Sequence, residues 1–291
     1  MTGHDKLRVR IECIALVVIV AALVCPAQQR EKRRFGAPTF WGPVRSVRVE
    51  RAEITNQNGK LIEGPRTLLQ TITYSEDGTR RELTVYRPDG AISGKSIDTY
   101  EPDGRILETK SFRDNGDPAN RMVSSYDDNK RLIERIIYRP DGSVSGRITF
   151  AYQDNKRIHR SVSYDQNGVI VSEVNGTLDL KTHRTQTISQ NPSQVVQRET
   201  VFTDSPGGQV YEEQVNGSPA LRTLSHPIGN GSSEFIEYSP DGAVQIRQRE
   251  KSELDSHGNS VKDIRLIAKG DSGDFQPVDV IFRSIEYYGK T

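Results

Sequence analysis

Apolar and polar residues alternate through most of this chain, and short clusters of Gly, Pro, Asp and Asn interrupt the alternation. The pattern is clear in residues 44–50, where valines alternate with Arg, Ser and Glu, and residues 67–74 read as a second strand. A period of two residues, enriched in β-branched and aromatic side chains, predicts β-strands. Between Tyr74 and Gly168 no segment has the longer period of a covering helix. The pattern therefore predicts an all-β protein.

An aromatic residue recurs through this region at intervals that alternate between 12 and 14 residues. The positions are Tyr74, Tyr86, Tyr100, Phe112, Tyr126, Tyr138, Tyr152 and Tyr164. The true period is therefore 26 residues, and a fixed period of this length is typical of a repeat architecture. We interpret the unit as two strands, one of which is longer than the other.

Most of these aromatic residues are followed by a turn cluster that ends in glycine, such as Pro88-Asp89-Gly90. Proline presets φ at the second turn position, and glycine takes the left-handed conformation that closes a hairpin with a G1 bulge. Since such turns join neighbouring strands directly, we predict an antiparallel meander of β-hairpins. Lys130 and Lys156 replace glycine in two turns, and there we expect the turn to shift onto the preceding Asp-Asn pair, because asparagine tolerates positive φ.

A small or turn-forming residue also recurs inside the longer strand of the unit. Gly94, Asn120 and Gly146 occupy the same phase of the repeat. Glycine or asparagine inside a strand suggests a β-bulge. We expect a bulge there to absorb the two extra residues of the longer strand.

Charged residues fall on both faces of the predicted strands, as in residues 131–138, where Glu134 lies in one phase and Arg131 and Arg135 lie in the other. The whole chain is only 34% hydrophobic and 27% charged, which favours a thin sheet with water on at least one face. We predict an open single sheet, twisted or curled, held by cross-strand pairs. The hairpin repeats are expected over 44–174, an irregular or degenerate-repeat β region over 175–235, and further β repeats over 236–291.

The first 27 residues have the features of a secretory signal peptide. Lys6, Arg8 and Arg10 precede the apolar run 14–24, and small residues near Ala27 suit cleavage. Residues 28–43 are expected to be a linker. The prediction is a secreted or periplasmic protein, and an uncleaved anchor or lipid attachment at Cys25 are the alternatives.

Cleavage near Ala27 would change the charge balance and the cysteine content of the chain. The chain has 40 Lys and Arg and 39 Asp and Glu; loss of three bases and two acids leaves 37 of each. A nucleic-acid partner calls for a basic excess, so none is expected. Both cysteines, Cys13 and Cys25, would also be lost. We expect no integral membrane domain after cleavage, because a lipid-facing strand surface should be free of charge.

The segments 100–106, 126–132 and 164–170 each begin with tyrosine, pass through a turn and continue into a strand. They resemble the YD (RHS-type) repeat of bacterial secreted proteins, which pairs a Tyr-Asp start with glycine and then Arg-Leu. Only Tyr126 and Tyr164 are followed by Asp, and the 12/14 spacing is shorter than the usual YD unit. The resemblance implies an exported bacterial β-repeat protein.

The sequence shows no nucleophile motif, zinc motif or phosphate loop, so we predict no catalytic, cofactor-binding or metal-binding residues. Asx-rich turns could offer oxygen ligands to calcium, but such turns need no metal. The candidate binding surface consists of Tyr86, Tyr100, Tyr126, Tyr138, Tyr152 and Tyr164, although a structural ladder is the alternative. We predict a non-enzymatic binding or surface-interaction module whose partner is a cell-surface glycan or an envelope protein. The alternative is a structural envelope component or the β-segment of a larger assembly.

Overall fold

The computed structural model describes residues 40–58, 60–152, 158–179, 184–191, 194–205, 208–229 and 232–289. The predicted signal peptide (1–27), most of the predicted linker (28–39) and the turn residue Lys156 lie outside these ranges. Within them the chain forms 19 β-strands and no helix.

The strands follow one another in chain order, most of them joined by short turns. Their bounds are β1 (Val44–Gln57), β2 (Lys60–Glu63), β3 (Thr67–Tyr74), β4 (Arg80–Tyr86), β5 (Ile92–Tyr100), β6 (Ile106–Phe112), β7 (Pro118–Tyr126), β8 (Leu132–Tyr138), β9 (Val144–Tyr152), β10 (Ile158–Asp165), β11 (Ile170–Asp179), β12 (Arg184–Asn191), β13 (Gln194–Ser205), β14 (Gly208–Val215), β15 (Ser218–Gly229), β16 (Ser232–Tyr238), β17 (Val244–Leu254), β18 (Ser260–Lys269) and β19 (Gln276–Tyr287). In the described part of the chain, no helix is long and apolar enough to cross a membrane.

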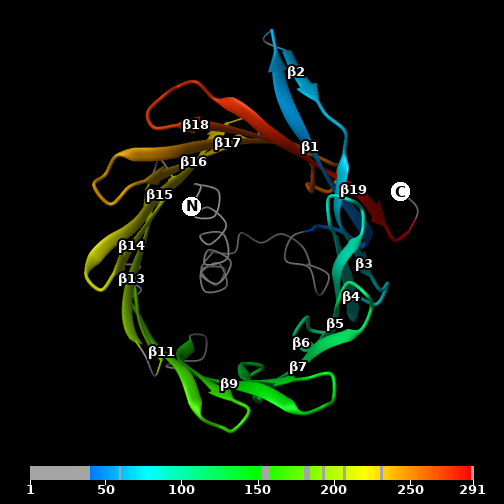
Figure 1. The fold of residues 1–291 in the computed structure, drawn as a ribbon, viewed down its shortest axis with the longest axis vertical. Coiled ribbons are helices and arrows are strands. Elements are labelled where there is room, and N and C mark those ends of the chain that lie inside the picture. Colours follow the sequence, from blue (N-terminus) through cyan, green and yellow to red (C-terminus); the bar gives the residue numbers. More distant parts are fainter. Residues whose placement is uncertain are drawn as a thin grey trace. The chain divides into compact units, whose positions relative to one another are not determined.

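The strands close into an antiparallel barrel (Figure 1). From β3 to β19 each strand pairs with the next, and β1 pairs with both β3 and β19. Of the described strands, 18 form the ring, while β2 pairs only with the far end of β1 and projects from the ring as a hairpin. The predicted open sheet is therefore wrong. Closure pairs the two strand edges that an open sheet would leave exposed.

The seam between β1 and β19 contains the best-buried apolar residues of the barrel. Pairing runs from Val44 opposite Tyr287 to Glu53 opposite Asp279. On one side of the seam Val47 is 1% exposed and packs with Ile72 and Tyr74, and on the other Val280 is fully buried beside Phe282. Burying an aliphatic side chain of this size contributes about 1.5–3 kcal/mol, so the seam stabilises the closed ring.

The 26-residue unit appears as alternating strands of nine and seven residues from β5 to β9. A bulge lies directly before Gly94, because Gly94 opposes Val85 whereas Ile92 opposes Tyr86. An equivalent irregularity occurs in the short strand β6, opposite Thr99 and Tyr100. Both kinds of strand thus carry a bulge, so the bulges do not absorb the two extra residues, and the long strands are simply longer.

The turn at Lys130 differs from the sequence prediction. The turn does not shift onto Asp128-Asn129; instead Lys130 itself adopts φ +63°, the left-handed conformation that Gly104 takes in the equivalent turn. The Lys130 N–H donates to the Asp127 carbonyl at 2.8 Å, as the Gly104 N–H does to Glu101. The hairpin geometry of the repeat therefore overrides the preference of lysine for negative φ.

Candidate functional site

The recurring aromatic residues divide between the two faces of the barrel wall. Residues directly opposite each other on paired strands share a face, and neighbours along a strand alternate. Arg80 and Tyr86 are six residues apart on β4 and therefore lie on the same face, and Arg80 opposes Thr99 on β5. Tyr100 follows Thr99 and so lies on the opposite face from Tyr86. The same register places Tyr74, Tyr100, Tyr126 and Tyr152 on one face, here called the Tyr100 face, and Tyr86, Phe112, Tyr138 and Tyr164 on the other, here called the Tyr138 face.

On the Tyr100 face the tyrosines are held by the fold itself. The Tyr126 hydroxyl donates to the carbonyl of Ile106 at 2.8 Å, and the Tyr152 hydroxyl donates to the carbonyl of Leu132 at 2.7 Å. Each bond reaches back 20 residues to the start of the preceding short strand. Arginines complete the unit, with Arg105 and Arg131 lying 4.8 and 5.0 Å from the centres of these two rings. These tyrosines are structural ties that repeat with the sequence.

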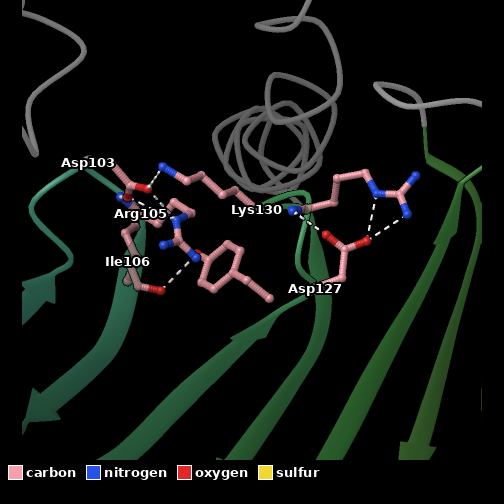
Figure 2. Close-up of polar contacts among 7 residues, drawn as sticks. Asp103, Arg105, Ile106, Asp127 and Lys130 are labelled. Atoms are coloured by element: carbon pink, nitrogen blue, oxygen red, sulfur yellow. Dashed lines mark hydrogen bonds and ion pairs between the residues drawn. The ribbon is translucent and has the colours of Figure 1, made fainter.

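Carboxylates at the turns fix the arginines of these ties. Arg105 donates from Nε to Asp103 at 2.8 Å, and Lys130 of the next turn on this rim reaches the same carboxylate at 3.0 Å (Figure 2). Bonds from Arg105 and Lys130 lower the pKa of Asp103 to about 2. Arg131, one repeat unit after Arg105, donates from Nε to Asp127 at 2.7 Å. The ion pair between Lys130 and Asp103 therefore ties these two neighbouring turns together.

Tyr100 is buried, with 5% of its surface exposed. Its hydroxyl lies 3.4 Å from Asp98, which also accepts hydrogen bonds from Arg81 at 2.9 and 2.5 Å and from Thr109 at 2.7 Å. Burial raises the pKa of Tyr100, and the Asp98 charge adds to the rise while Arg81 opposes it. Tyr100 is thus part of a buried network and offers no surface to a ligand.

The Tyr138 face carries a row of aromatic residues, one at the end of every second strand. Its members are Tyr86 on β4, Phe112 on β6, Tyr138 on β8 and Tyr164 on β10. Neighbouring strands lie about 4.8 Å apart, so successive members of this aromatic row are separated by about 10 Å. The row follows one rim of the barrel, next to the turns that open the long strands.

Arginines hold two rings of the row from one side. Arg121 lies 5.0 Å from the centre of the Tyr138 ring, and Arg147 lies 5.1 Å from the centre of the Tyr164 ring. Both arginines are themselves paired, Arg121 with Glu108 and Arg147 with Glu134 at 2.8 Å. The side chains of Arg121 and Arg147 are about half exposed, and a cation over an aromatic face contributes about 0.5–1 kcal/mol at such sites.

The hydroxyl groups of Tyr138 and Tyr164 make no hydrogen bond to any described residue, in contrast to those of Tyr126 and Tyr152. Tyr86 differs, since its hydroxyl lies 3.4 Å from Thr71 Oγ1. Each tyrosine of the row also faces an exposed aliphatic residue on the next strand: Ile92 (42% exposed), Val144 (40%) and Ile170 (44%). Amphipathic rings beside exposed aliphatic groups can stack on a ligand and donate hydrogen bonds to it.

The six tyrosines predicted as one binding surface therefore do not lie together. Tyr86, Tyr138 and Tyr164 share the aromatic row, whereas Tyr100, Tyr126 and Tyr152 lie on the opposite face with their hydroxyls bonded internally. Sequence reasoning missed Phe112 as a member of the row and the aliphatic residues beside it. The register of the bulged hairpins is the signal that separates the two sets, and it shows only in the strand pairing. Among the described residues, no three His, Cys, Asp or Glu side chains gather closely enough to hold a metal ion.

No protein-family model matches the chain, so the resemblance to YD repeats is not confirmed, and no curated protein matches it. The solved structures that match include a porin-like protein from Bacteroides uniformis, at 11% identity and a TM-score of 0.40, over 87% of this chain and all of that one. A TcdB2-TccC3 structure matches at 14% identity with a TM-score of 0.28, and the Photorhabdus luminescens Tc holotoxin pore matches at 12% identity with a TM-score of 0.23. This chain spans only 15% of each of those two chains.

Proposed function

We propose that this protein is an exported, non-enzymatic β-barrel that binds an extended ligand, such as a cell-surface glycan chain, along the aromatic row. The observation that carries the proposal is the contrast between the two tyrosine sets. One set has its hydroxyls bonded within the fold, while Tyr138 and Tyr164 keep theirs unbonded beside exposed aliphatic residues.

The repeat spacing of the row favours a ligand that is itself a linear repeat. Rings about 10 Å apart offer equivalent contacts to successive units of a polymer. Each ring supplies an apolar face and, at Tyr138 and Tyr164, a hydroxyl donor. Weak contacts of this kind add up when several are engaged by one chain, so we expect affinity to increase with ligand length.

We infer that both faces of the barrel wall are exposed to water. The Tyr138 face carries Glu108, Glu134, Arg121 and Arg147, and the Tyr100 face carries the Arg81–Asp98 pair. A barrel that crosses a bilayer needs an apolar outer band, and charge there costs about 2–4 kcal/mol per Arg or Lys at mid-depth. Separation of the native protein into aqueous and membrane fractions tests this inference, and recovery in washed membranes would contradict it.

Assembly through exposed strand edges is the second candidate function, and ring closure weakens its basis. The edges of β1 and β19 are paired with each other. Of the described strands, only β2 and the end of β1 beside it, residues 54–57, lie outside the ring. A four-residue strand offers a short template for pairing, so the aromatic row is the better-supported site.

Binding to a panel of bacterial surface glycans of graded length tests the proposed function. We expect Tyr138→Ala combined with Tyr164→Ala to weaken the binding that the panel reveals by about tenfold or more, since stacking contacts of about 1 kcal/mol each are lost together with their hydrogen bonds. Tyr211→Ala is the matched control, because Tyr211 is a half-buried tyrosine of another strand whose hydroxyl bonds to Glu213. Equal binding by the double variant, or no binding to any glycan, would contradict the proposal.

A further inference from the structure

A hollow of 390 Å³ lies where β17, β18, β19, β1 and β3 meet. It belongs to the Tyr100 face, as the strand register shows. Leu83 on β4 opposes Ile72 on β3, Ile72 opposes Val47 on β1, and Val47 opposes Ile285 on β19. Arg283, in the hollow, lies two residues before Ile285 and therefore on the same face. The hollow is therefore on the opposite side of the wall from the aromatic row. It is lined by Arg51, Leu69, Gln248, Glu250, Asp263, Arg265, Asp279, Ile281 and Arg283.

Two arginines of the hollow are fixed by a fully buried carboxylate. Asp279 accepts two hydrogen bonds from Arg265, at 3.0 and 2.5 Å, and an ion pair from Arg51 Nε at 2.6 Å. A bidentate pair of this kind sets the plane of the guanidinium group. Nη1 of Arg265 and both Nη groups of Arg51 make no hydrogen bond to a described residue. These donors remain available to a ligand.

A third arginine is fixed by Asp263. The Asp263 carboxylate accepts hydrogen bonds from Ser252 at 2.6 Å and Ser260 at 2.5 Å, and it pairs with Arg283. Burial alone would raise the pKa of Asp263, but the two serines and Arg283 together lower it. Asp263 is therefore an ionised carboxylate whose charge is balanced by Arg283. Nη2 of Arg283 makes no hydrogen bond to a described residue.

Glu250 is the exception among the charged residues of the hollow. It makes no hydrogen bond or ion pair with any described residue, although it opposes Arg265 in the strand register. Burial raises the pKa of Glu250 and the nearby Asp263 charge adds to the rise, while the charges of Arg283 and Arg265 oppose it. The net rise is consistent with a part-buried carboxylate that forms no direct ion pair.

We propose that this hollow binds a small zwitterion of the amino-acid type, whose carboxylate lies against the free guanidinium donors and whose ammonium group lies against Glu250. The hollow has three guanidinium groups and three carboxylates, so its charges cancel when Glu250 is ionised. A lone anion would lie beside Glu250 and Asp263, and a lone cation would meet three arginines. A zwitterion satisfies both the free donors and the unpaired acceptor, and its net charge of zero matches the hollow.

The remaining lining suits the rest of such a ligand. Leu69 and Ile281 give the hollow an apolar wall, and Gln248 adds a polar amide. The volume lies at the lower end of the range for small-molecule sites, about 300–1,000 Å³. An amino acid with an aliphatic side chain, or a dipeptide, has the right size and chemistry.

Calorimetric titration of the full protein with L-leucine, L-leucinamide and N-acetyl-L-leucine tests the proposal. The amide lacks the carboxylate and the acetyl derivative lacks the ammonium group. We expect saturable binding of leucine and binding of each derivative that is at least about tenfold weaker, since each loses one charge-assisted contact. Equal affinity for either derivative would overturn the zwitterion. The absence of saturable binding by leucine, glycine and dialanine up to about 10 mM would overturn the site.

Glu250→Gln separates the role of this carboxylate from a general effect on the fold. The variant is expected to weaken leucine about tenfold and to leave the affinity for N-acetyl-L-leucine unchanged. Glu253→Gln is the matched control, because Glu253 is exposed on the same strand and lies on the opposite face. Unchanged leucine binding by Glu250→Gln would overturn the assignment. Glycan binding at the aromatic row is independent of this result.

Discussion

Tyr152 donates a hydrogen bond of 2.7 Å to the carbonyl oxygen of Leu132, 20 residues earlier in the chain. Tyr126 makes the same bond to Ile106, one 26-residue unit before. The two bonds tie the ends of the long strands β7 and β9 to the starts of the short strands that precede them on the Tyr100 face. They therefore explain why the tyrosine recurs with the repeat period without requiring a ligand.

Removal of this tie should cost stability. We expect Tyr152→Phe to lower the free energy of unfolding by about 1 kcal/mol, because the Leu132 carbonyl loses its bond from Tyr152. Tyr138→Phe should change it by less than about 0.5 kcal/mol, because that hydroxyl bonds to no described residue. Urea unfolding followed by circular dichroism measures both. Equal losses in the two variants would show that the two tyrosine sets do not differ in this way.

Lys130 provides a second test of the repeat. Its φ of +63° is unfavourable for a residue with a side chain, by about 1 kcal/mol relative to glycine. Lys130→Gly should therefore raise the unfolding midpoint, although loss of the exposed ion pair with Asp103 offsets part of the gain. Gly104→Ala, at φ +90° in the equivalent turn, should lower the midpoint. A lower midpoint for Lys130→Gly would mean that the ion pair outweighs the backbone strain.

The pH dependence of stability should identify Glu250 as a destabilising group when it is ionised. The groups that face it are Asp263, Arg265, Asp279 and Arg283. Its pKa is raised in the folded state, so the folded protein holds this proton more tightly than the unfolded chain does, and Glu250 contributes a loss of stability as pH rises above the unfolded value near 4.5. We expect Glu250→Gln to be more stable than the natural protein at pH 7, with the difference disappearing near pH 4. A difference that grows at low pH would contradict the raised pKa.

Asp263 should act in the opposite direction. Its pKa is lowered, so it contributes stability above the unfolded value near 3.8 that is lost as pH falls through the folded pKa. Asp263→Asn should therefore be less stable than the natural protein at pH 7, and the difference should shrink in acid. The same unfolding series measures it, with Asp263→Asn compared with the natural protein from pH 7 to about pH 3.

Much of the local structure could be predicted from the sequence, because local chemistry decides it. The alternation of Val and polar residues predicts the strands, and Pro88-Asp89-Gly90 predicts a turn in which Gly90 has positive φ, as observed. The glycine at position 94, inside a strand, also predicts the bulge that is observed beside it. These features depend on a few neighbouring residues, so one sequence is enough to indicate them.

The closure of the ring and the division of the tyrosines could not be predicted in the same way. Ser46 on β1 pairs with Glu286 on β19, 240 positions later, and the local sequence of neither strand indicates which strand it pairs with. The face of Tyr100 relative to Tyr86 depends on a bulge that shifts the register by one residue. A one-residue shift reverses the faces, so a row that looks continuous in sequence is split in space.

The closed ring is the central claim, and a disulfide scan across the seam tests it most directly. With Cys13 and Cys25 replaced by serine, Arg48→Cys combined with Ser284→Cys joins directly opposed positions of β1 and β19, whose Cα separation in an antiparallel pair suits a disulfide. Arg48→Cys with Thr71→Cys, on β1 and β3, is the positive control, because these strands are neighbours in an open sheet as well. The closed barrel predicts intramolecular disulfides in both pairs in the native monomer. A disulfide in the control pair alone would contradict closure.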